Sequence, residues 1–201
     1  MARALNKSRI MVSKVLGLIV LLCVFFTTSA IQDESTLHEV FDVLGLLFVF
    51  ICALGRLYTT AFLGGKKNKD LITHGPFSVV RNPLYVCSLI GFTGVAFMTN
   101  HVILMVLVPL SFTILYHFLV SREEQFLKET FGREYEGYCA KVHRFVPSFS
   151  LWQQPKSITL DTKMFFNGLK DALWWFAAFP LVEIVEYVHE INLVPSLFFV
   201  P

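Results

Sequence analysis

Charged residues are scarce in this chain. Only 16% of its 201 residues are Asp, Glu, Lys or Arg, against roughly 25% in an ordinary soluble domain. Hydrophobic residues make up 55% of the sequence, and Phe alone occurs 21 times. A soluble fold of this length cannot cover so much apolar surface, so the composition indicates a protein that lies in a membrane.

Several signatures of soluble enzymes and metal sites are also missing. The four cysteines include no Cys-x-x-Cys pair, so neither a disulfide framework nor a zinc site is indicated. The six histidines form no clustered boxes, and there is no Walker motif, no Gly-x-Gly-x-x-Gly and no evident Ser-His-Asp or Cys-His set. Glu186-x-x-His189 matches half of a di-iron site, but no further carboxylates complete it. We therefore expect no bound metal and no nucleic-acid partner.

Long apolar runs predict transmembrane helices, each of which needs about 20 mostly apolar residues. The candidate spans are residues 10–31, 40–58, 85–99 and 102–120. The Asn100-His101 step between the last two is too short for anything but an antiparallel helical hairpin. Residues 1–30 also fit a secretory signal, with a basic start and an apolar centre, and this alternative stays open.

The basic residues alternate along these spans. Lys and Arg precede the first span, are absent from the loop after it, return in residues 59–83 and recur after Val120. Cytosolic loops carry an excess of Lys and Arg, so the N-terminus, residues 59–83 and the region after Val120 should face the cytosol. The two longest polar stretches then meet on one side and can build one site. The plasma or inner membrane and the endoplasmic reticulum are the expected locations.

The chain changes character after Val120. Residues 122–142 carry charges with apolar residues at helical spacing, which predicts a cytosolic or interfacial amphipathic helix, broken at Gly132. Residues 165–190 are apolar again but are interrupted by Pro180 and two glutamates. This favours an interfacial or re-entrant helix, with a fifth span as the alternative. The expected fold is all-α and polytopic, with four to five transmembrane helices.

Two polar clusters lie at the predicted cytosolic ends of the hairpin. The first runs over residues 69–77 and continues as Arg81-Asn82-Pro83-Leu84-Tyr85; the second is Arg122-Glu123-Glu124. Gly-Pro in the first cluster predicts a tight turn, and Pro83 suits the first turn of a helix. Because the two spans form a hairpin, Arg81 and the acidic pair should face each other. A membrane-surface anchor with a salt-bridge partner explains the same pattern without a function.

In order and spacing, these segments resemble the isoprenylcysteine carboxyl methyltransferase family, which is related to the phospholipid methyltransferases. The matching pieces, within residues 40–147, are Leu71-Ile72-Thr73-x-Gly75-Pro76-Phe77, Arg81-Asn82-Pro83-Leu84-Tyr85, Glu123-Glu124, Phe131-Gly132-x-Glu134-Tyr135-x-x-Tyr138 and Val142-x-Arg144-Phe145-Val146-Pro147. The resemblance implies a multi-span helical enzyme with a cytosolic region that binds S-adenosylmethionine. It methylates a membrane-embedded or lipidic acceptor, such as the carboxylate of an isoprenylcysteine-like substrate. Where the prenylcysteine enzymes carry an Arg one turn before the motif glutamate, this chain has Leu119.

The resemblance also assigns roles to individual residues. The cofactor contacts that it implies are Lys69, Asp70, Leu71, Ile72, Phe77, Asn82, Pro83, Leu84, Tyr85 and Glu123. Glu123 would hold the positively charged end of the cofactor or its ribose, and two aromatic rings would face the adenine and the sulfonium. Arg81 and Glu124 are the expected catalytic residues, and Arg122 is the expected substrate contact. For an amine or hydroxyl acceptor, the candidate bases are His74 and Glu124.

These expectations divide the chain into three parts: N-terminal transmembrane helices (1–62), a methyltransferase core (63–147) and a C-terminal connector with its helix (148–201), which by hypothesis covers the site. The expected partners are the lipid bilayer and a lipidic or small hydrophobic acceptor. Two other functions stay open: a non-catalytic membrane scaffold or binding protein, and a membrane lipid or steroid reductase that uses a nicotinamide cofactor. The sequence decides neither the acceptor nor the oligomeric state.

Overall fold

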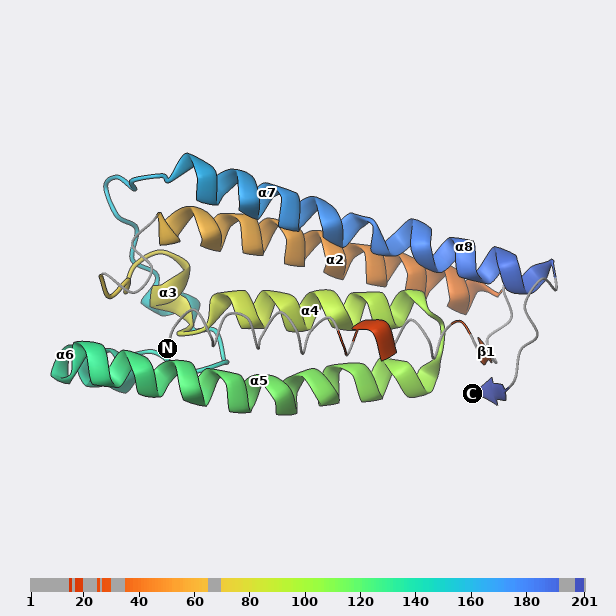
Figure 1. Cartoon of the computed structure of the whole chain (residues 1–201), viewed down its shortest axis with the longest axis horizontal. Coiled ribbons are helices and arrows are strands. Elements are labelled where there is room, and N and C mark those ends of the chain that lie inside the picture. Colours follow the sequence, from red (N-terminus) through yellow and green to blue (C-terminus); the bar gives the residue numbers. More distant parts are fainter. Residues whose placement is uncertain are drawn as a thin grey trace.

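The computed structural model is a bundle of long helices with shorter ones at one end (Figure 1). It describes residues 15, 17–19, 25, 27–29, 35–64, 70–191 and 198–200. Its named helices are α2 (Thr36–Leu63), α3 (Pro76–Val79), α4 (Pro83–Met98), α5 (Val102–Phe131), α6 (Arg133–Lys141), the 3-10 turn η1 (Phe149–Leu151), α7 (Thr162–Phe176) and α8 (Ala178–Glu190). Two short strands, β1 (Thr27–Ser29) and β2 (Phe198–Val200), pair in parallel. Over the described ranges the fold is helical, as predicted, apart from this pair.

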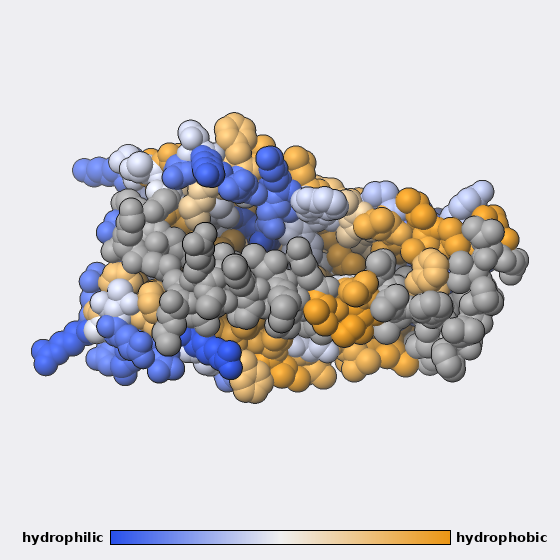
Figure 2. Space-filling model, viewed as in Figure 1, coloured by the Kyte–Doolittle hydropathy of each residue, from blue (hydrophilic) through white to orange (hydrophobic). Residues whose placement is uncertain are grey.

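Among the described helices, α2 and α5 are long and apolar enough to cross a membrane, and α4 is a shorter apolar helix. Their outward side chains are exposed, as at Val43 (67%) and Val106 (61%). Figure 2 shows most hydrophilic residues toward the end that holds α3 and α6, with hydrophobic residues dominating the opposite half. These features indicate a membrane protein. The first predicted span lies mostly outside the described residues, and the total number of spans stays a prediction.

The contact between α2 and α4 depends on small residues. A Cβ added to Gly94 would lie 2.6 Å from the carbonyl oxygen of Gly45, and a Cβ added to Gly45 would lie 2.6 Å from that of Gly94. Nearer the other end of the contact, a Cβ on Gly91 would lie 2.5 Å from Cys52 Sγ. Side chains at these positions would force the helices apart. Small residues are what allow transmembrane helices to approach this closely.

Helices α4 and α5 form the predicted antiparallel hairpin. α4 ends at Met98, Asn100 takes a positive φ of 54° in the turn, and α5 begins at Val102. Asn is among the residues that tolerate this left-handed conformation. Asn100 is completely buried and donates from Nδ2 to Asp42 Oδ1 on α2 at 2.9 Å. The turn is thereby fixed to the neighbouring helix.

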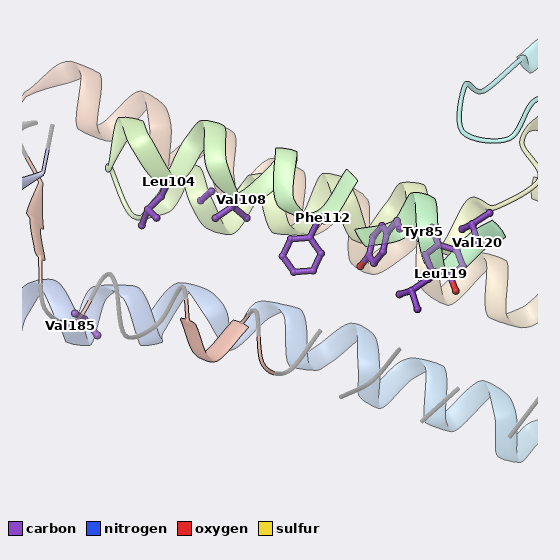
Figure 3. Packing of buried hydrophobic residues seen from close by; sticks show 9 residues of the cluster. Tyr85, Leu104, Val108, Phe112, Leu119, Val120 and Val185 are labelled. Atoms are coloured by element: carbon purple, nitrogen blue, oxygen red, sulfur yellow. The ribbon is translucent and has the colours of Figure 1, made fainter. Parts of the chain in front are cut away.

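One side of α5 is buried from Leu104 to Val120. Figure 3 shows this row from Leu104 through Phe112 to Val120, with Tyr85 of α4 beside it. Beyond Val120, α5 continues without interruption to Phe131, so the helix predicted from residue 122 begins as a continuation of the predicted span. No Gly or Pro stands between residues 121 and 131 to end the helix. The break comes at Gly132, as predicted, where φ is 53°.

Helix α7 packs along α2, and α8 continues nearly in line with it (Figure 1). Pro180 lies in the first turn of α8, where its missing N–H has little cost, and this explains the break between the two helices. Arg56 of α2 binds Asp171 of α7, with Nη2 2.6 Å from Oδ2, and it also donates to Ser88 of α4. The two helices therefore run one after the other beside α2. Whether this pair crosses the membrane stays a prediction.

Replacing Gly94 by Ala should weaken the α2–α4 contact, because the new Cβ would overlap backbone that cannot turn aside. We expect a loss of about 1–3 kcal/mol, the usual range for overpacking, measured as a lower melting temperature in detergent. Gly137→Ala is the control: its Cβ meets nothing within 4 Å, and Ala favours a helix interior over Gly by about 0.5–1 kcal/mol. Equal melting temperatures for Gly94→Ala and the wild type would contradict the close approach.

Candidate functional site

A cavity opens at the end of the bundle where α2 ends and α4 begins. The space between its walls is about 740 Å³, part of which is open to solvent. Its wall consists of Leu63, Asp70, Leu71, Ile72, Phe77, Arg81, Asn82, Pro83, Leu84, Tyr85, Glu123, Leu127, Tyr135 and Tyr138. Segments far apart in the sequence therefore form one concave surface.

The structure brings most of the expected site residues to this wall. Nine of the ten expected cofactor contacts line it; the tenth, Lys69, lies outside the described residues. Arg81 also lines it, and Glu124 lies behind it, with Oε1 3.4 Å from Arg81 Nη1. Arg122 is exposed on α5, and neither it nor His74 belongs to the wall. The roles expected for all these residues remain predictions.

One glycine and two prolines shape the first part of the wall. Gly75 takes a φ of 60°, and a Cβ there would overlap the ring of Phe62, so no other residue fits this turn without strain. Pro76 and Pro83 stand in the first turns of α3 and α4, where a helix needs no N–H. The tight turn and the start of α4 agree with the predictions from the sequence.

Residues 142–153, here called the strap, run back along residues 75–82 and hold them. Three backbone hydrogen bonds of 2.8–2.9 Å join the two segments: Arg81 N–H to His143 O, Ser148 N–H to Val79 O, and Gly75 N–H to Gln153 O. Just before the strap, Tyr138 donates its hydroxyl proton to the carbonyl oxygen of Phe77 at 2.6 Å. The wall is thus supported by chain that follows it by some 60 to 80 residues.

Charge on the wall is mainly negative. Tyr85 donates from its hydroxyl to Glu123 Oε2 at 2.9 Å, which orients that carboxylate. Asp70 is the other acidic residue of the wall, and Arg81 is the one basic residue on its described part. The described part of the wall thus carries two carboxylates against one guanidinium, a balance that suits a ligand with positive charge.

Two buried tyrosines of α6 complete the wall, and the sequence analysis gave them no role. Their spacing of three places Tyr135 and Tyr138 on one helix face, but spacing alone does not show which cavity that face meets. Burial raises the pKa of Tyr135, and the nearby Glu124 and Cys139 raise it further. Burial also raises the pKa of Tyr138, against the opposing effect of Arg81.

These pKa shifts predict a loss of stability in alkali. Both phenols keep their protons in the folded protein above the ordinary pKa of 10.0, whereas the unfolded chain releases them there. The contribution of the two neutral phenols to the free energy of unfolding is therefore complete below pH about 10 and is lost as the pH rises further. We expect the melting temperature to fall more steeply between pH about 9.5 and about 11.5 in the wild type than in a Tyr135→Phe, Tyr138→Phe double variant.

Tyr187→Phe is the matched control for this titration, because Tyr187 is 61% exposed. It should follow the wild type across the whole range. Equal slopes for the wild type and the double variant would show that the two phenols of α6 are not held in their neutral form.

Comparison with known proteins shows the family to which this chain belongs. The family model described as phospholipid methyltransferase matches residues 38–134, from α2 to the start of α6, and these include all but two residues of the described wall, Tyr135 and Tyr138. The cobalt-zinc-cadmium resistance protein CzcN of Cupriavidus metallidurans is 30% identical over 186 residues, which are 92% of this chain and 85% of CzcN. The chain belongs to the phospholipid methyltransferase family.

Two further proteins are similar to this chain. The nickel-cobalt-cadmium resistance protein NccN of Alcaligenes xylosoxydans xylosoxydans is 27% identical over 197 residues, 98% of this chain and 92% of NccN. A "Probable protein-S-isoprenylcysteine O-methyltransferase" of Oryza sativa is 35% identical over 102 residues, 48% of this chain and 51% of the rice protein. No solved structure matches. The rice protein confirms the resemblance seen in the sequence motifs.

Proposed function

We propose that this protein transfers a methyl group from S-adenosylmethionine to an acceptor that is embedded in the membrane. The observation that carries the proposal is the single cavity on whose wall nine of the ten expected cofactor contacts lie. The match to the phospholipid methyltransferase family over residues 38–134 supports it. Membership of the family alone would also suit a scaffold without activity, whereas a cavity with this lining suits a ligand.

The residues present fit the proposed cofactor. S-adenosylmethionine carries a sulfonium and an ammonium against one carboxylate, so its net charge is positive, and the wall offers Asp70 and Glu123. The apolar part of the wall, with Leu71, Ile72 and Leu84, suits the adenosyl moiety. Phe77 and Tyr85 offer aromatic faces, which attract a desolvated cation by about 2 kcal/mol. When bound, the cofactor supplies an activated methyl group.

The protein then has to align the reacting groups and exclude water. Holding two reactants in line can lower a barrier by about 7–11 kcal/mol, and this needs rigid walls rather than a nucleophile. The strap, the Gly75 turn and the first turn of α4 supply that rigidity through backbone hydrogen bonds. A dry cavity also favours a reaction in which opposite charges are neutralised.

The acceptor is proposed to reach the cavity from the bilayer. Exposed apolar side chains cover the outer faces of α2 and α5, so a lipidic molecule can diffuse along the same surface that ends at Leu63 and Leu127 of the wall. We further propose that the cavity faces the cytosol, on the distribution of Lys and Arg. The isoprenylcysteine carboxylate remains one candidate acceptor, although Leu119 is buried in the core here and offers no charge to a carboxylate. Arg122 remains the proposed contact for it.

The names of CzcN and NccN concern resistance to metals. Within the described residues, no group of three His, Cys, Asp or Glu side chains is arranged to hold a metal ion. The proposal therefore depends on the cavity. Any link between methyl transfer and metal resistance would depend on which acceptor molecule is methylated.

Calorimetric binding of S-adenosylhomocysteine to the detergent-purified protein tests the proposal. We expect micromolar affinity in the wild type. Tyr85→Phe removes the hydroxyl that orients Glu123, and Glu123→Gln removes the charge, so each should weaken binding by about tenfold, or about 1.4 kcal/mol. The matched control is Glu129→Gln, an exposed glutamate on the same helix.

Absence of binding by the wild type, in detergent and again in lipid nanodiscs, would contradict the proposal. Binding of a nicotinamide dinucleotide in its place would favour the reductase alternative, and binding of neither would favour a scaffold. Unchanged affinity in both variants would place the cofactor elsewhere in the protein.

A further inference from the structure

Glu124 lies at the centre of an ion-pair network behind the cavity wall. Its Oε2 is 2.8 Å from Arg144 Nη2, and its Oε1 is 3.4 Å from Arg81 Nη1. The side chains are mostly buried: Glu124 and Arg81 are each 16% exposed, and Arg144 is 23% exposed. Both oxygens of the carboxylate thus have cationic partners. A carboxylate paired in this way is better suited to holding its neighbours in position than to taking a proton from an acceptor.

The network reaches the cavity through Asn82. This side chain donates from Nδ2 to the carbonyl oxygen of Arg144 at 3.2 Å and to Glu124 Oε1 at 3.4 Å. Asn in the position before a helix usually caps it by accepting a backbone N–H, but Asn82 makes no such bond. Because the amide nitrogen is held behind the wall, the carbonyl oxygen is the atom that remains to accept a hydrogen bond from a ligand.

Arg144 is itself held in place. Its Nη2 also donates to Ser121 Oγ at 2.8 Å, one turn before Glu124 on α5, and its guanidinium lies over the ring of Phe145 at 5.6 Å from the centroid. Arg144 belongs to the strap, so its side chain joins the strap to α5 while its backbone joins the strap to Asn82. Loss of this side chain would remove the connection to α5 and leave the backbone carbonyl that Asn82 contacts without that support.

We propose that Glu124 and Arg144 are positioning residues that act through Asn82. They orient its amide so that the carbonyl oxygen accepts a hydrogen bond from a donor group of the cofactor, an ammonium or a hydroxyl. The inference rests on the proposed function, and it replaces the role of catalytic residue and candidate base that was expected for Glu124.

The test is a double-mutant cycle on S-adenosylhomocysteine affinity. Glu124→Gln, Arg144→Ala and Asn82→Ala should each weaken binding by about tenfold. Once Asn82 is Ala, adding Glu124→Gln or Arg144→Ala should weaken binding by less than about twofold further, because both residues act through the same amide. A general loss of stability would instead add to the effect of Asn82→Ala. Melting temperatures, measured beside the affinities, show that each variant is folded.

Glu136→Gln is the matched control, since Glu136 forms an exposed pair with Lys128 at 2.9 Å, and it should bind as the wild type does. If Arg144→Ala does not fold, Arg144→Lys replaces it with the same expectation, because Lys keeps the charge but lacks the forked donors. Unchanged affinity in the single variants, or fully additive losses with Asn82→Ala, would overturn the inference and leave the proposed function intact. No binding by the wild type would overturn both.

Discussion

The close approach of α2 and α4 is the constraint on which the rest of the structure depends. Lipid tails are as apolar as leucine, so helices in a bilayer gain little by burying apolar side chains against each other and associate mainly through tight packing and polar contacts. Gly45 and Gly94 provide that packing by letting backbone meet backbone. Because the two helices run in opposite directions, the last residue of α2 and the first turn of α4 come to the same end (Figure 1). Leu63 and Leu84 therefore share the cavity wall.

The polar groups gather at that end for a related reason. A backbone group or charge without a partner is costly inside the hydrocarbon region, so irregular chain and ion pairs are best placed where the helices leave it. The strap satisfies the backbone of residues 75–82, and the Glu124 network pairs two guanidinium groups with one carboxylate. The result is a wall built partly from irregular backbone that is nevertheless held by hydrogen bonds and ion pairs. The alignment of two reactants demands such fixed positions.

Much of this could be predicted from local patterns, and the remainder depends on contacts over long distances in the sequence. The Asn100 turn, the start of α4 at Pro83 and the break at Gly132 are local events, set by one or two residues, and the structure has them where the sequence placed them. The sequence did not decide whether the span of residues 102–120 and the helix predicted from residue 122 are one helix, because a change from apolar to charged residues marks a change of surroundings and does not by itself end a helix. No pattern showed that the strap would pair with residues 75–82, or that α7 would lie along α2, since hydrogen bonds and ion pairs between distant segments leave no periodicity in the sequence.

The adjacent glutamates of α5 show how one short motif separates into two tasks. Neighbouring residues on a helix point about 100° apart, so Glu123 and Glu124 cannot face the same partner. Glu123 meets the hydroxyl of Tyr85 on the cavity wall, while Glu124 meets Arg81 and Arg144 behind it. A sequence motif records both residues with equal weight and does not show which of them meets the cavity. The geometry instead places the Glu123 carboxylate on the cavity wall, where Tyr85 orients it, and leaves the Glu124 carboxylate to hold the two arginines behind the wall.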